Sequence, residues 1–477
     1  MSILRVFAIA AAGLIASCAE VPIAKLVPPV AQEVTAASAP ASLVDTEDGD
    51  VTLAARGVEV STPEFPLATP QLSVTTSTPT PLTQAGQPVT WWFVFKFNAK
   101  SFPSCGPTTV KRSCPFGGVV QPYKQFSQQY VYASDTQPTL QKGGGCVGDS
   151  QNDPLGATFD EIYSHPFHYV VWNDQFYDAP KIKGCTKSCS APWGHSKGML
   201  VWNDAGEGLV LQVTTPSWPA AGSRGHPRVL DGNTLGCIKN NNVLVSQHFF
   251  ALKLSKDDVV KVLVALQNAS VVTDPTNPKL VNNGGPADIQ VRVANLGIKS
   301  GSTTFTKETL STGTVLVSKP SNLNVPPWQF VSAVLGGTSL RTSTWWNAPR
   351  IYTTTASKKI SCWDNSLAKP GRVEIATTGQ WDGTDFGLAG GPGANFNHAK
   401  IGVSISNAKH LAIFGDMNQQ GAVTGNCASS QNGRGGLFFI IENPALTTSL
   451  TTLIDGDTAP TKAPIVKPSL PVRRPVP

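Results

Sequence analysis

Charged side chains are scarce in this chain of 477 residues. Asp, Glu, Lys and Arg make up only 14% of the residues, which argues against a coiled coil and against an intracellular helical protein. Lys and Arg number 37 against 31 Asp and Glu, so the net charge is +6. This modest positive charge permits an anionic substrate but does not by itself predict one.

Beyond its first residues, the sequence has no apolar run long enough to span a bilayer. Residues 1–18 are typical of an export signal, because a basic residue precedes an apolar run over 6–15 and small residues follow. Residues 14–18 resemble a bacterial lipobox, in which Cys18 is lipidated after cleavage; ordinary cleavage without a lipid is the alternative. The sequence therefore predicts an exported protein, and the lipobox favours a periplasmic or cell-surface lipoprotein, with the outer membrane as one location.

Recognisable metal-binding motifs are also missing. The sequence has neither a His-Glu-x-x-His pair nor a carboxylate cluster at calcium-loop spacing. Of nine cysteines, all but Cys18 remain in the exported chain, an even number that is typical of disulfide bonds. Cys185-x3-Cys189 could form half of a metal site, but the other cysteines offer no matching close pair, so a disulfide is favoured.

Composition divides the chain into five segments. After the signal, residues 19–87 are rich in Pro, Thr, Ser, Ala and Val, which predicts an extended, flexible spacer. The C-terminal tail, 460–477, has a similar composition and predicts disorder. We divide the body between them at the loop-like stretch 271–285, into an N-terminal half over 88–275 and a C-terminal half over 276–459.

Short strands separated by turn residues dominate the body. One helix is clear over 255–266, with Ser255 as its N-cap and with Val259, Val260, Leu263 and Leu266 on one face. Strands alternating with loops and a few helices in two halves predict a mixed α/β (α+β) fold with a duplicated body. The predicted strands are 89–97, 130–132, 168–172, 193–202, 209–213, 360–363, 397–403, 411–414 and 437–441.

Two of the seven histidines are followed by Lys at the second position, His195 before Lys197 and His398 before Lys400. Each pair leads into an apolar run, so we expect each to lie on a buried strand, where alternate side chains share a face. A lone pair of this kind is more often structural, but two copies in matching contexts favour a duplicated functional site. The histidines without a following Lys receive no catalytic role: His165, His168, His226, His248 and His410.

Two imidazoles and two ammonium groups are what the metal-free hydrolysis of a phosphodiester needs. One imidazole attacks phosphorus, the other protonates the leaving oxygen, and the ammonium groups hold the non-bridging oxygens. These roles place the imidazoles on opposite sides of phosphorus, which a pseudo-twofold axis between the halves would supply. We therefore expect no metal and no other cofactor.

At this point the residues resemble a known family. His195-Ser196-Lys197 and His398-Ala399-Lys400 resemble the paired His-x-Lys motifs of the phospholipase D superfamily. More specifically, residues 89–445 resemble deoxyribonuclease II. The segments that support this resemblance are 91–96, 169–175, 194–198, 215–219, 233–237, 416–418 and 431–436.

The resemblance implies a metal-independent, typically acid-active endonuclease that cuts DNA to 3′-phosphate products through a phosphohistidine. The implied fold has two phospholipase D-like halves in one chain, forming a pseudo-dimeric, U-shaped clamp around duplex DNA. By motif match His195, Lys197, His398 and Lys400 are catalytic, and we favour His195 as nucleophile and His398 as general acid. The oligomeric state is not indicated.

Four further residues have both a functional and a structural interpretation. Asp416 could orient an imidazole or be a turn residue. Asn418 could bond a phosphate oxygen or have only a structural role. Trp218 could stack on a base or pack in the core. Arg434 could contact a backbone phosphate or be an ordinary surface charge.

Two other functions remain open on the sequence. The same fold could act on RNA, a phospholipid or another phosphodiester. Alternatively, the chain could be a catalytically silent surface lipoprotein that binds a partner through its β-rich body.

Overall fold

The computed structural model describes residues 77–105, 129–148, 150–176, 182, 185, 189–216, 218–219, 221–226, 244–405 and 408–463. These contain five α-helices and two large sheets, so the mixed α/β class is confirmed. Within these ranges no helix is both long and apolar enough to cross a bilayer. The predictions for the export signal, Cys18, the tail from 464 onward and the spacer up to residue 76 fall on residues outside the described ones.

The first large sheet has eight strands in the order β10-β6-β7-β8-β9-β3-β4-β5, with every neighbouring pair antiparallel. Its strands come from one continuous region of the chain apart from β10, which follows the predicted division at 275/276. The strands are β3 (Trp91–Lys96), β4 (Tyr130–Ser134), β5 (Gln141–Lys142), β6 (His168–Asn173), β7 (Lys197–Trp202), β8 (Gly208–Val213), β9 (Gln247–Leu254) and β10 (Val281–Asn282).

The second large sheet has seven strands in the order β11-β12-β19-β18-β17-β13-β14. Only its β13–β14 pair is parallel. The strands are β11 (Thr306–Thr309), β12 (Val315–Lys319), β13 (Leu340–Ser343), β14 (Val373–Ile375), β17 (Ile401–Ser404), β18 (Leu411–Gly415) and β19 (Gly436–Glu442).

The same arrangement of strands and helices occurs in both sheets. The order β6-β7-β8-β9-β3 in the first sheet corresponds to β13-β17-β18-β19-β12 in the second. A helix precedes β6 and β13, namely α1 (Pro154–Ser164) and α4 (Pro327–Val334). Another follows β9 and β19, namely α2 (Lys256–Asn268) and α5 (Pro444–Leu453). The chain thus contains a repeated unit, and each copy carries one His–Lys motif at the start of its second strand.

Aromatic side chains pack the two sheets against each other. The ring of Phe414 on β18 stacks on Phe93 of β3 and Phe250 of β9, with centroids 4.5 and 4.7 Å apart. On β19, Phe439 joins this shared core while its neighbour Phe438 faces a second core around Trp328. This alternation is the period of two expected of a strand buried on both faces.

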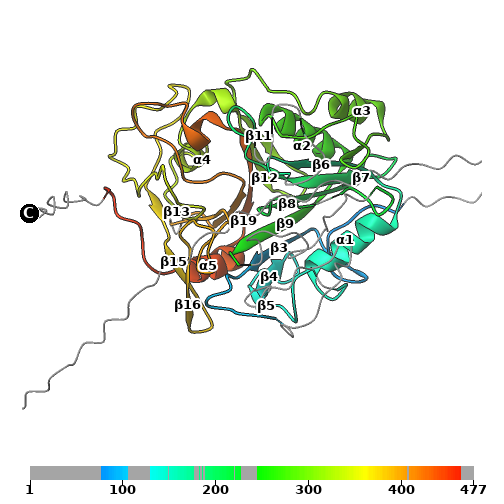
Figure 1. The fold of residues 1–477 in the computed structure, drawn as a ribbon, viewed down its shortest axis with the longest axis horizontal. Helices are drawn as coiled ribbons and strands as arrows, with labels where there is room; N and C mark the ends of the chain where they lie inside the picture. The colour runs from blue at the N-terminus through cyan, green and yellow to red at the C-terminus, as the bar shows by residue number, and fades with distance from the viewer. Residues whose placement is uncertain are drawn as a thin grey trace, which may run out of the picture. The chain divides into compact units, whose positions relative to one another are not determined.

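The predicted helix is confirmed as α2, and its N-terminus has the expected cap. Ser255 accepts a hydrogen bond from the backbone of Asp258, whose side chain accepts from the Ser255 backbone. Val259, Val262 and Leu263 are buried, whereas Val260, which we placed on the buried face, is only partly covered. The helix packs on β8 and β9 of the first sheet and on β12 and β19 of the second (Figure 1).

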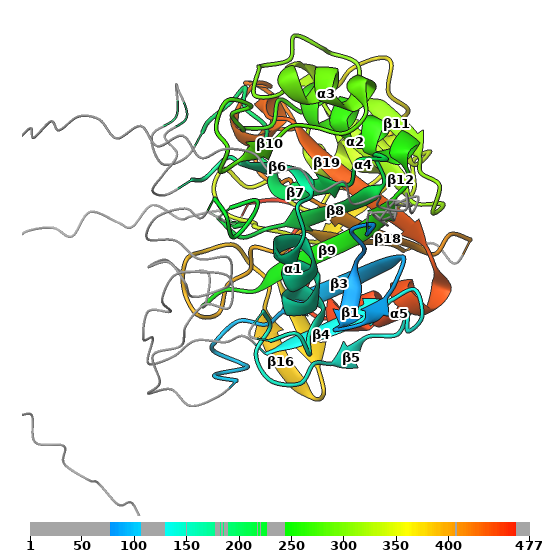
Figure 2. The same ribbon diagram turned by 90° about the vertical axis from the view of Figure 1, so that its right-hand side faces the viewer.

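The folded body includes residues that composition assigned to the spacer. β1 (Leu82–Gln84) and β2 (Gln87–Pro88) form a hairpin, and the Leu82 N–H donates to the Thr158 hydroxyl at 3.0 Å. The same hydroxyl accepts from Trp92 Nε1 at 2.9 Å, which ties the hairpin and α1 to β3 (Figure 2). A second small hairpin, β15 (Thr378–Trp381) with β16 (Thr384–Gly387), and the helix α3 (Ala287–Ala294) complete the elements.

Two of the strand predictions need correction. Residues 360–363 form no strand, because Cys362 is tied to Cys427 by a disulfide bond and its backbone N–H donates to Val423 O. The motif histidines lie just before strands rather than within them, since β7 begins at Lys197 and β17 at Ile401.

Disulfide bonds rather than a metal site explain the cysteines that the structure describes. Cys105 pairs with Cys146, Cys362 with Cys427, and the closely spaced Cys185 with Cys189, as we favoured. Cys114 and Cys237 lie outside the described residues.

Candidate active site

Both His–Lys pairs line one cavity of about 170 Å³. All four side chains are buried, with exposed fractions of 8% or less, so a ligand there would meet little competing water. The cavity is lined by Gln175, His195, Lys197, Thr214, Pro216, Trp345, His398, Lys400 and Asn418.

Each motif is held by backbone atoms of the other repeated unit. The His195 N–H donates to Gly435 O, directly before β19, and the His398 N–H donates to Ser246 O, directly before β9; both distances are 2.8 Å. Because the last strand of each unit anchors the motif of the other, the packing of the two sheets also sets the separation of the two imidazoles.

Glycine is required where the chain approaches the first motif. A Cβ atom on Gly435 would lie 2.1 Å from Ala269 O, and one on Gly194 would lie 2.5 Å from the same oxygen. The Gly194 N–H also donates to Ser270 O at 2.9 Å. The end of α2 therefore fits between these two glycines, and a larger residue at either position would push the motif away.

The ring of His195 has a defined tautomer. Its Nδ1 lies 2.7 Å from the backbone oxygen of Asp416, which can only accept, so Nδ1 carries the proton. The neutral imidazole then has its lone pair on Nε2. Burial, followed by the nearby Lys197 ammonium, lowers the pKa of His195 well below its usual value, which keeps this ring neutral.

The ring of His398 packs against Trp345 in an edge-on arrangement, with centroids 4.4 Å apart. Its Nε2 is buried and has no hydrogen-bond partner within the described part of the chain. Burial and the Lys400 ammonium lower the pKa of His398 well below its usual value, and a hydrogen bond with the Gly391 backbone opposes this. An unpartnered, buried nitrogen beside a cavity is suited to exchange a proton with a ligand.

Lys197 belongs to a buried charged cluster with Asp174 and Arg434. Its Nζ donates to Asp174 Oδ1 at 2.5 Å, and Arg434 Nη2 donates to Asp174 Oδ2 at 2.8 Å. Burial alone would raise the pKa of Asp174, but Lys197, Arg434 and His195 together hold it well below its usual value. The carboxylate therefore stays ionised and fixes the position of the Lys197 ammonium.

Lys400 forms no ion pair with a carboxylate in the part of the chain that the structure describes, although Asp416 and Asp174 are near enough to raise its pKa slightly. Its Nζ donates to the backbone oxygen of His398. Burial lowers the pKa of Lys400 to about 7, with Lys197 adding to the effect. The ammonium is thus fully charged only on the acid side of neutrality, unless an anion binds next to it.

The Asp416 carboxylate does not contact the motif histidines. It accepts from Gln212 Nε2 and the Leu437 N–H, both at 3.0 Å, and from the Ser196 hydroxyl. Burial raises the pKa of Asp416 to about 7. Instead, the backbone oxygen of Asp416 orients the ring of His195, because it accepts a hydrogen bond from Nδ1.

A protein-family model matches the part of the chain that forms this site. The model for deoxyribonuclease II matches residues 80–457, which includes both motifs and both large sheets. The chain belongs to the deoxyribonuclease II family. Membership makes it a hydrolytic endodeoxyribonuclease with DNA as its substrate, and together with the disulfide bonds it indicates a secreted protein. No curated protein sequence matches the chain.

Asn418, for which the sequence left a functional and a structural interpretation open, lines the cavity. Its Nδ2 donates to Gln420 Oε1 at 2.9 Å, and Gln420 is in turn fixed because its own amide donates to Asn347 O and Ala348 O. Asn418 Oδ1 is buried without a hydrogen-bond partner among the described residues. This oxygen is an acceptor, so it suits a water molecule or a hydroxyl better than an anionic phosphate oxygen.

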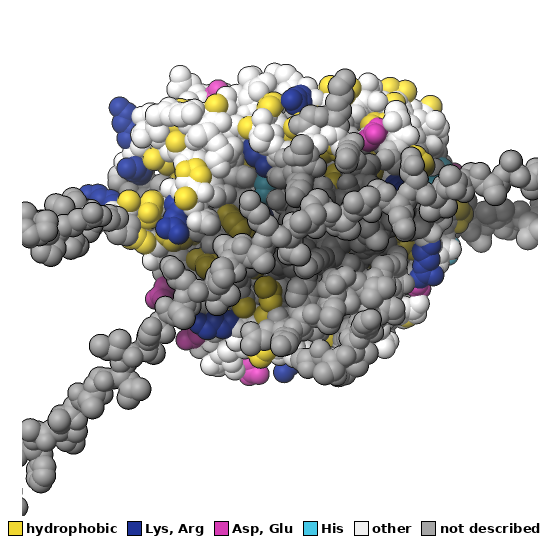
Figure 3. Space-filling model, in the orientation of Figure 1, with side chains coloured by type: hydrophobic (Ala, Val, Ile, Leu, Met, Phe, Trp, Pro, Cys, Tyr) yellow, Lys and Arg dark blue, Asp and Glu magenta, His cyan; other side chains and the backbone are white. Residues whose placement is uncertain are grey.

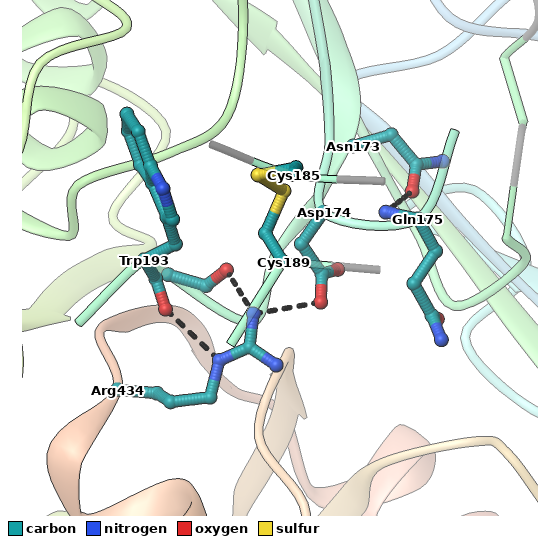
Figure 4. The surroundings of a disulfide bond; sticks show 8 residues. Asn173, Asp174, Gln175, Cys185, Cys189, Trp193 and Arg434 are labelled. Carbon is teal, nitrogen blue, oxygen red and sulfur yellow. Dashed lines mark hydrogen bonds and ion pairs between the residues drawn. A yellow bond between two sulfur atoms is a disulfide. The ribbon is translucent and has the colours of Figure 1, made fainter. Parts of the chain in front are cut away.

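Two predicted substrate-binding residues do not line the cavity of this deoxyribonuclease II homologue. Trp218 is 2% exposed and packs edge-on against Phe159 and Phe249, with centroids 4.7 and 5.1 Å apart. Arg434 is also buried, and besides Asp174 it donates to Trp193 O and Gly194 O (Figure 4). Trp218 therefore packs in the core and Arg434 supports Asp174.

Sequence reasoning missed several residues at the cavity. The tryptophan that lines the cavity is Trp345 and not the predicted Trp218, and Gln175 and Thr214 add polar groups. Gln175 and Thr214 lie within or beside segments that resemble the family, which was the only signal for them. Lys and Arg side chains are scattered over the visible described surface in Figure 3 rather than gathered in one patch, in keeping with the modest net charge.

No three His, Cys, Asp or Glu side chains come together as metal ligands within the described ranges. The donor set at the cavity consists of two imidazoles, two ammonium groups, two amides and a hydroxyl. Ammonium groups repel a cation and attract an anion, so the chemistry of this cavity fits a phosphate group.

Proposed function

We propose that this chain hydrolyses DNA without a metal ion, through a phosphohistidine formed on His195 and with His398 as general acid. The observation that carries the proposal is that both His–Lys pairs, which are far apart in the sequence, line one cavity. The hydrogen bond from His195 Nδ1 to Asp416 O supports the choice of nucleophile, because it leaves the Nε2 lone pair for attack.

In the first step, Nε2 of His195 bonds to phosphorus and the bond from phosphorus to the 5′-oxygen breaks. His398 gives its proton to that oxygen, so a neutral hydroxyl leaves. In the second step His398 takes a proton from water, the hydroxide attacks phosphorus, and the phosphorus–nitrogen bond breaks. The products are a 3′-phosphate and a 5′-hydroxyl, and the enzyme returns to its initial state.

Lys197 and Lys400 stabilise the charge on the non-bridging oxygens during both steps. The surroundings of the two ammonium groups differ. Lys197 is held beside the ionised Asp174, whereas burial lowers the pKa of Lys400 to about 7. Lys400 is therefore charged below this pH.

Acid activity follows from the same groups. His398 must be protonated to act as an acid, and burial lowers its pKa, so it is charged in the free enzyme only at acid pH. The nucleophile His195 must stay neutral, because protonation would remove its lone pair. We therefore propose a bell-shaped pH profile with its maximum on the acid side.

Digestion of a plasmid in EDTA, from about pH 4 to about pH 8, tests the proposal. We expect the mature protein to cleave, and His195→Ala and His398→Ala each to reduce the rate by about 10²- to 10⁴-fold. His226→Ala, at an exposed position, is the matched control and should cleave as the wild type does. Loss of wild-type activity in EDTA, or cleavage that survives both substitutions, would overturn the mechanism.

The same assay separates the other functions. RNA and phospholipid vesicles offered in place of the plasmid identify a different phosphodiester substrate. Binding of DNA with no cleavage of any substrate would mark a catalytically silent binding protein.

We further propose that the two repeated units are phospholipase D-like halves that hold duplex DNA between them as a clamp. The matching strand orders support two related halves. We also propose that the lipobox-like sequence directs lipidation of Cys18, so that the spacer tethers the enzyme to a membrane. Incorporation of labelled palmitate into the wild type but not into Cys18→Ser tests the anchor.

A further inference from the structure

His248 has no predicted catalytic role. It lies on β9, two residues after Ser246, which binds the backbone of His398. It is completely buried where the two sheets meet, with its ring centroid 6.1 Å from that of Phe93 and 6.3 Å from that of Phe414. A polar ring in such aromatic surroundings is stable only if its nitrogens are hydrogen-bonded.

The Nδ1 atom of His248 accepts the backbone N–H of Lys400 at 3.0 Å. Because this nitrogen accepts, the neutral ring carries its proton on Nε2, which faces Gln212 Oε1 at 3.5 Å. Burial, with Lys400 adding to it, lowers the pKa of His248 well below its usual value, so the ring stays in this accepting form.

This bond supplies an acceptor that the strands do not. The Lys400 backbone oxygen accepts from Gly415 of β18, but the Lys400 N–H bonds to His248 instead of to β13. Lys197 is already part of β7 and is paired with Asn173 of β6. In the second unit β17 begins only at Ile401, whose partner on β13 is Ser343. The Lys400 N–H thus comes before the ladder starts, and the imidazole of His248 supplies its acceptor.

The chain of contacts continues to the first motif. Gln212 Nε2 donates to Asp416 Oδ1 at 3.0 Å, and the backbone oxygen of Asp416 accepts from His195. Each donor and acceptor in this series is fixed by its neighbour, so the series can be satisfied in only one orientation.

We propose that His248 is a positioning residue for the reaction, which holds the backbone between His398 and Lys400 in place and links it through Gln212 and Asp416 to His195. The inference rests on the proposed function, since it assigns His248 to the support of that same site. His248 itself does not line the cavity and contacts no reacting atom.

The consequence for catalysis follows from the two anchors of the second motif. Without the bond to His248, His398 keeps its backbone bond to Ser246, but the Lys400 N–H loses its acceptor. The imidazole and the ammonium group then shift relative to phosphorus. A displacement of about 1 Å at a reacting group reduces turnover by about 10²-fold.

Two substitutions separate this role from simple burial of a polar ring. His248→Asn places an amide oxygen near the position of Nδ1 and should preserve the acceptor for Lys400. His248→Gln extends further, to the position of Nε2, and should preserve only the contact with Gln212. Both are neutral and polar, and His226→Asn is the control at an exposed histidine.

We expect kcat on plasmid DNA to stay within about threefold of the wild type in His248→Asn and to fall by about 10²-fold in His248→Gln, with a smaller change in KM. Equal kcat values in the two variants would overturn the assignment. Urea unfolding of all proteins confirms that the comparison is made between folded enzymes.

A measurement without substrate keeps this inference separate from the proposed function. In protein labelled with ¹³C at histidine, we expect the ring resonance of His398 to shift in His248→Gln and to remain in place in His248→Asn. Unchanged His398 resonances in both variants would refute the positioning role even if the wild type cleaved DNA. A wild type that cleaved nothing would refute the proposed function and leave this test decisive for His248.

Discussion

Arg434 allows a sharp test of what the charged cluster does. Its guanidinium makes hydrogen bonds to Asp174, Trp193 O and Gly194 O while 7% exposed, and Asp174 is 1% exposed. Arg434→Gln would leave Asp174 paired with Lys197 alone and would take hydrogen bonds from two buried backbone oxygens. Breaking a buried ion pair of this kind costs about 3–5 kcal/mol. We expect Arg434→Gln to lower the free energy of unfolding by about this amount.

The matched control is Arg224→Gln. Arg224 forms an ion pair with Asp160 at 2.6 Å, but its side chain is 50% exposed. Such a surface pair contributes only about 0–1 kcal/mol, because solvent screens it. Urea unfolding with the disulfide bonds intact measures both variants under the same conditions.

The pH dependence of this stabilisation has a defined sign. The pKa of Asp174 is held well below its usual value, so its contribution is complete above the unfolded pKa of about 3.9. The contribution is lost only as the pH falls through the lowered pKa of the folded state. The difference between wild type and Arg434→Gln should therefore be undiminished at about pH 5, where we expect the enzyme to be active.

A direct contact between Arg434 and a DNA phosphate would give the opposite result. Loss of such a contact reduces the slope of log affinity against log salt concentration by about 1, with little effect on stability. Binding can be measured without cleavage in a His195→Ala background. A reduced slope with a stability change below about 0.5 kcal/mol would refute the structural role.

Three other predictions concern the cavity and the core. Cleavage should decline as the pH rises through about 7, because Lys400 then loses its proton, and a kcat/KM profile that stays flat from about pH 6 to about pH 9 would contradict this. Trp218→Ala should reduce the free energy of unfolding by about 3–5 kcal/mol, because it empties a buried site, with kcat little changed. Trp345→Ala should instead lower kcat with a smaller effect on unfolding, because Trp345 packs on His398; steady-state kinetics and urea unfolding of both variants show whether these roles are reversed.

The sequence predicts best those features that depend on local pattern. The N-cap of α2 was predictable because Ser255 and Asp258 satisfy each other within one turn. The repeated His–Lys spacing was predictable because both repeated units need the same two groups. The apolar runs of β8, β18 and β19 were predictable because each is buried on both faces.

Features that depend on contacts across the two sheets could not be predicted from the sequence. Nothing near His248 indicates Lys400, since the bond between them forms only when β9 meets the second motif. The carboxyl group of Asp416 was one of two open interpretations, as the partner of an imidazole or as a turn residue. The structure uses the backbone oxygen of Asp416 for the imidazole of His195, and no side-chain pattern predicts a backbone contact. Arg434 has the charge of a phosphate-binding residue, and only its burial shows a different use.

The one difference between the two motifs, Ser196 against Ala399, is explained by these supports. We expected this position to point away from the His–Lys face, and the Ser196 hydroxyl indeed contacts Asp416 and accepts from Trp172 Nε1 at 2.8 Å. Ala399 lies in the apolar core, and its backbone N–H bonds to Asn397. Two motifs with the same His and Lys groups are therefore supported by different hydrogen-bond networks. A symmetric pair would give both imidazoles the same properties, whereas attack and proton donation require different ones. Because the contacts around the two copies of the motif differ, each imidazole has its own surroundings, as two separate roles require.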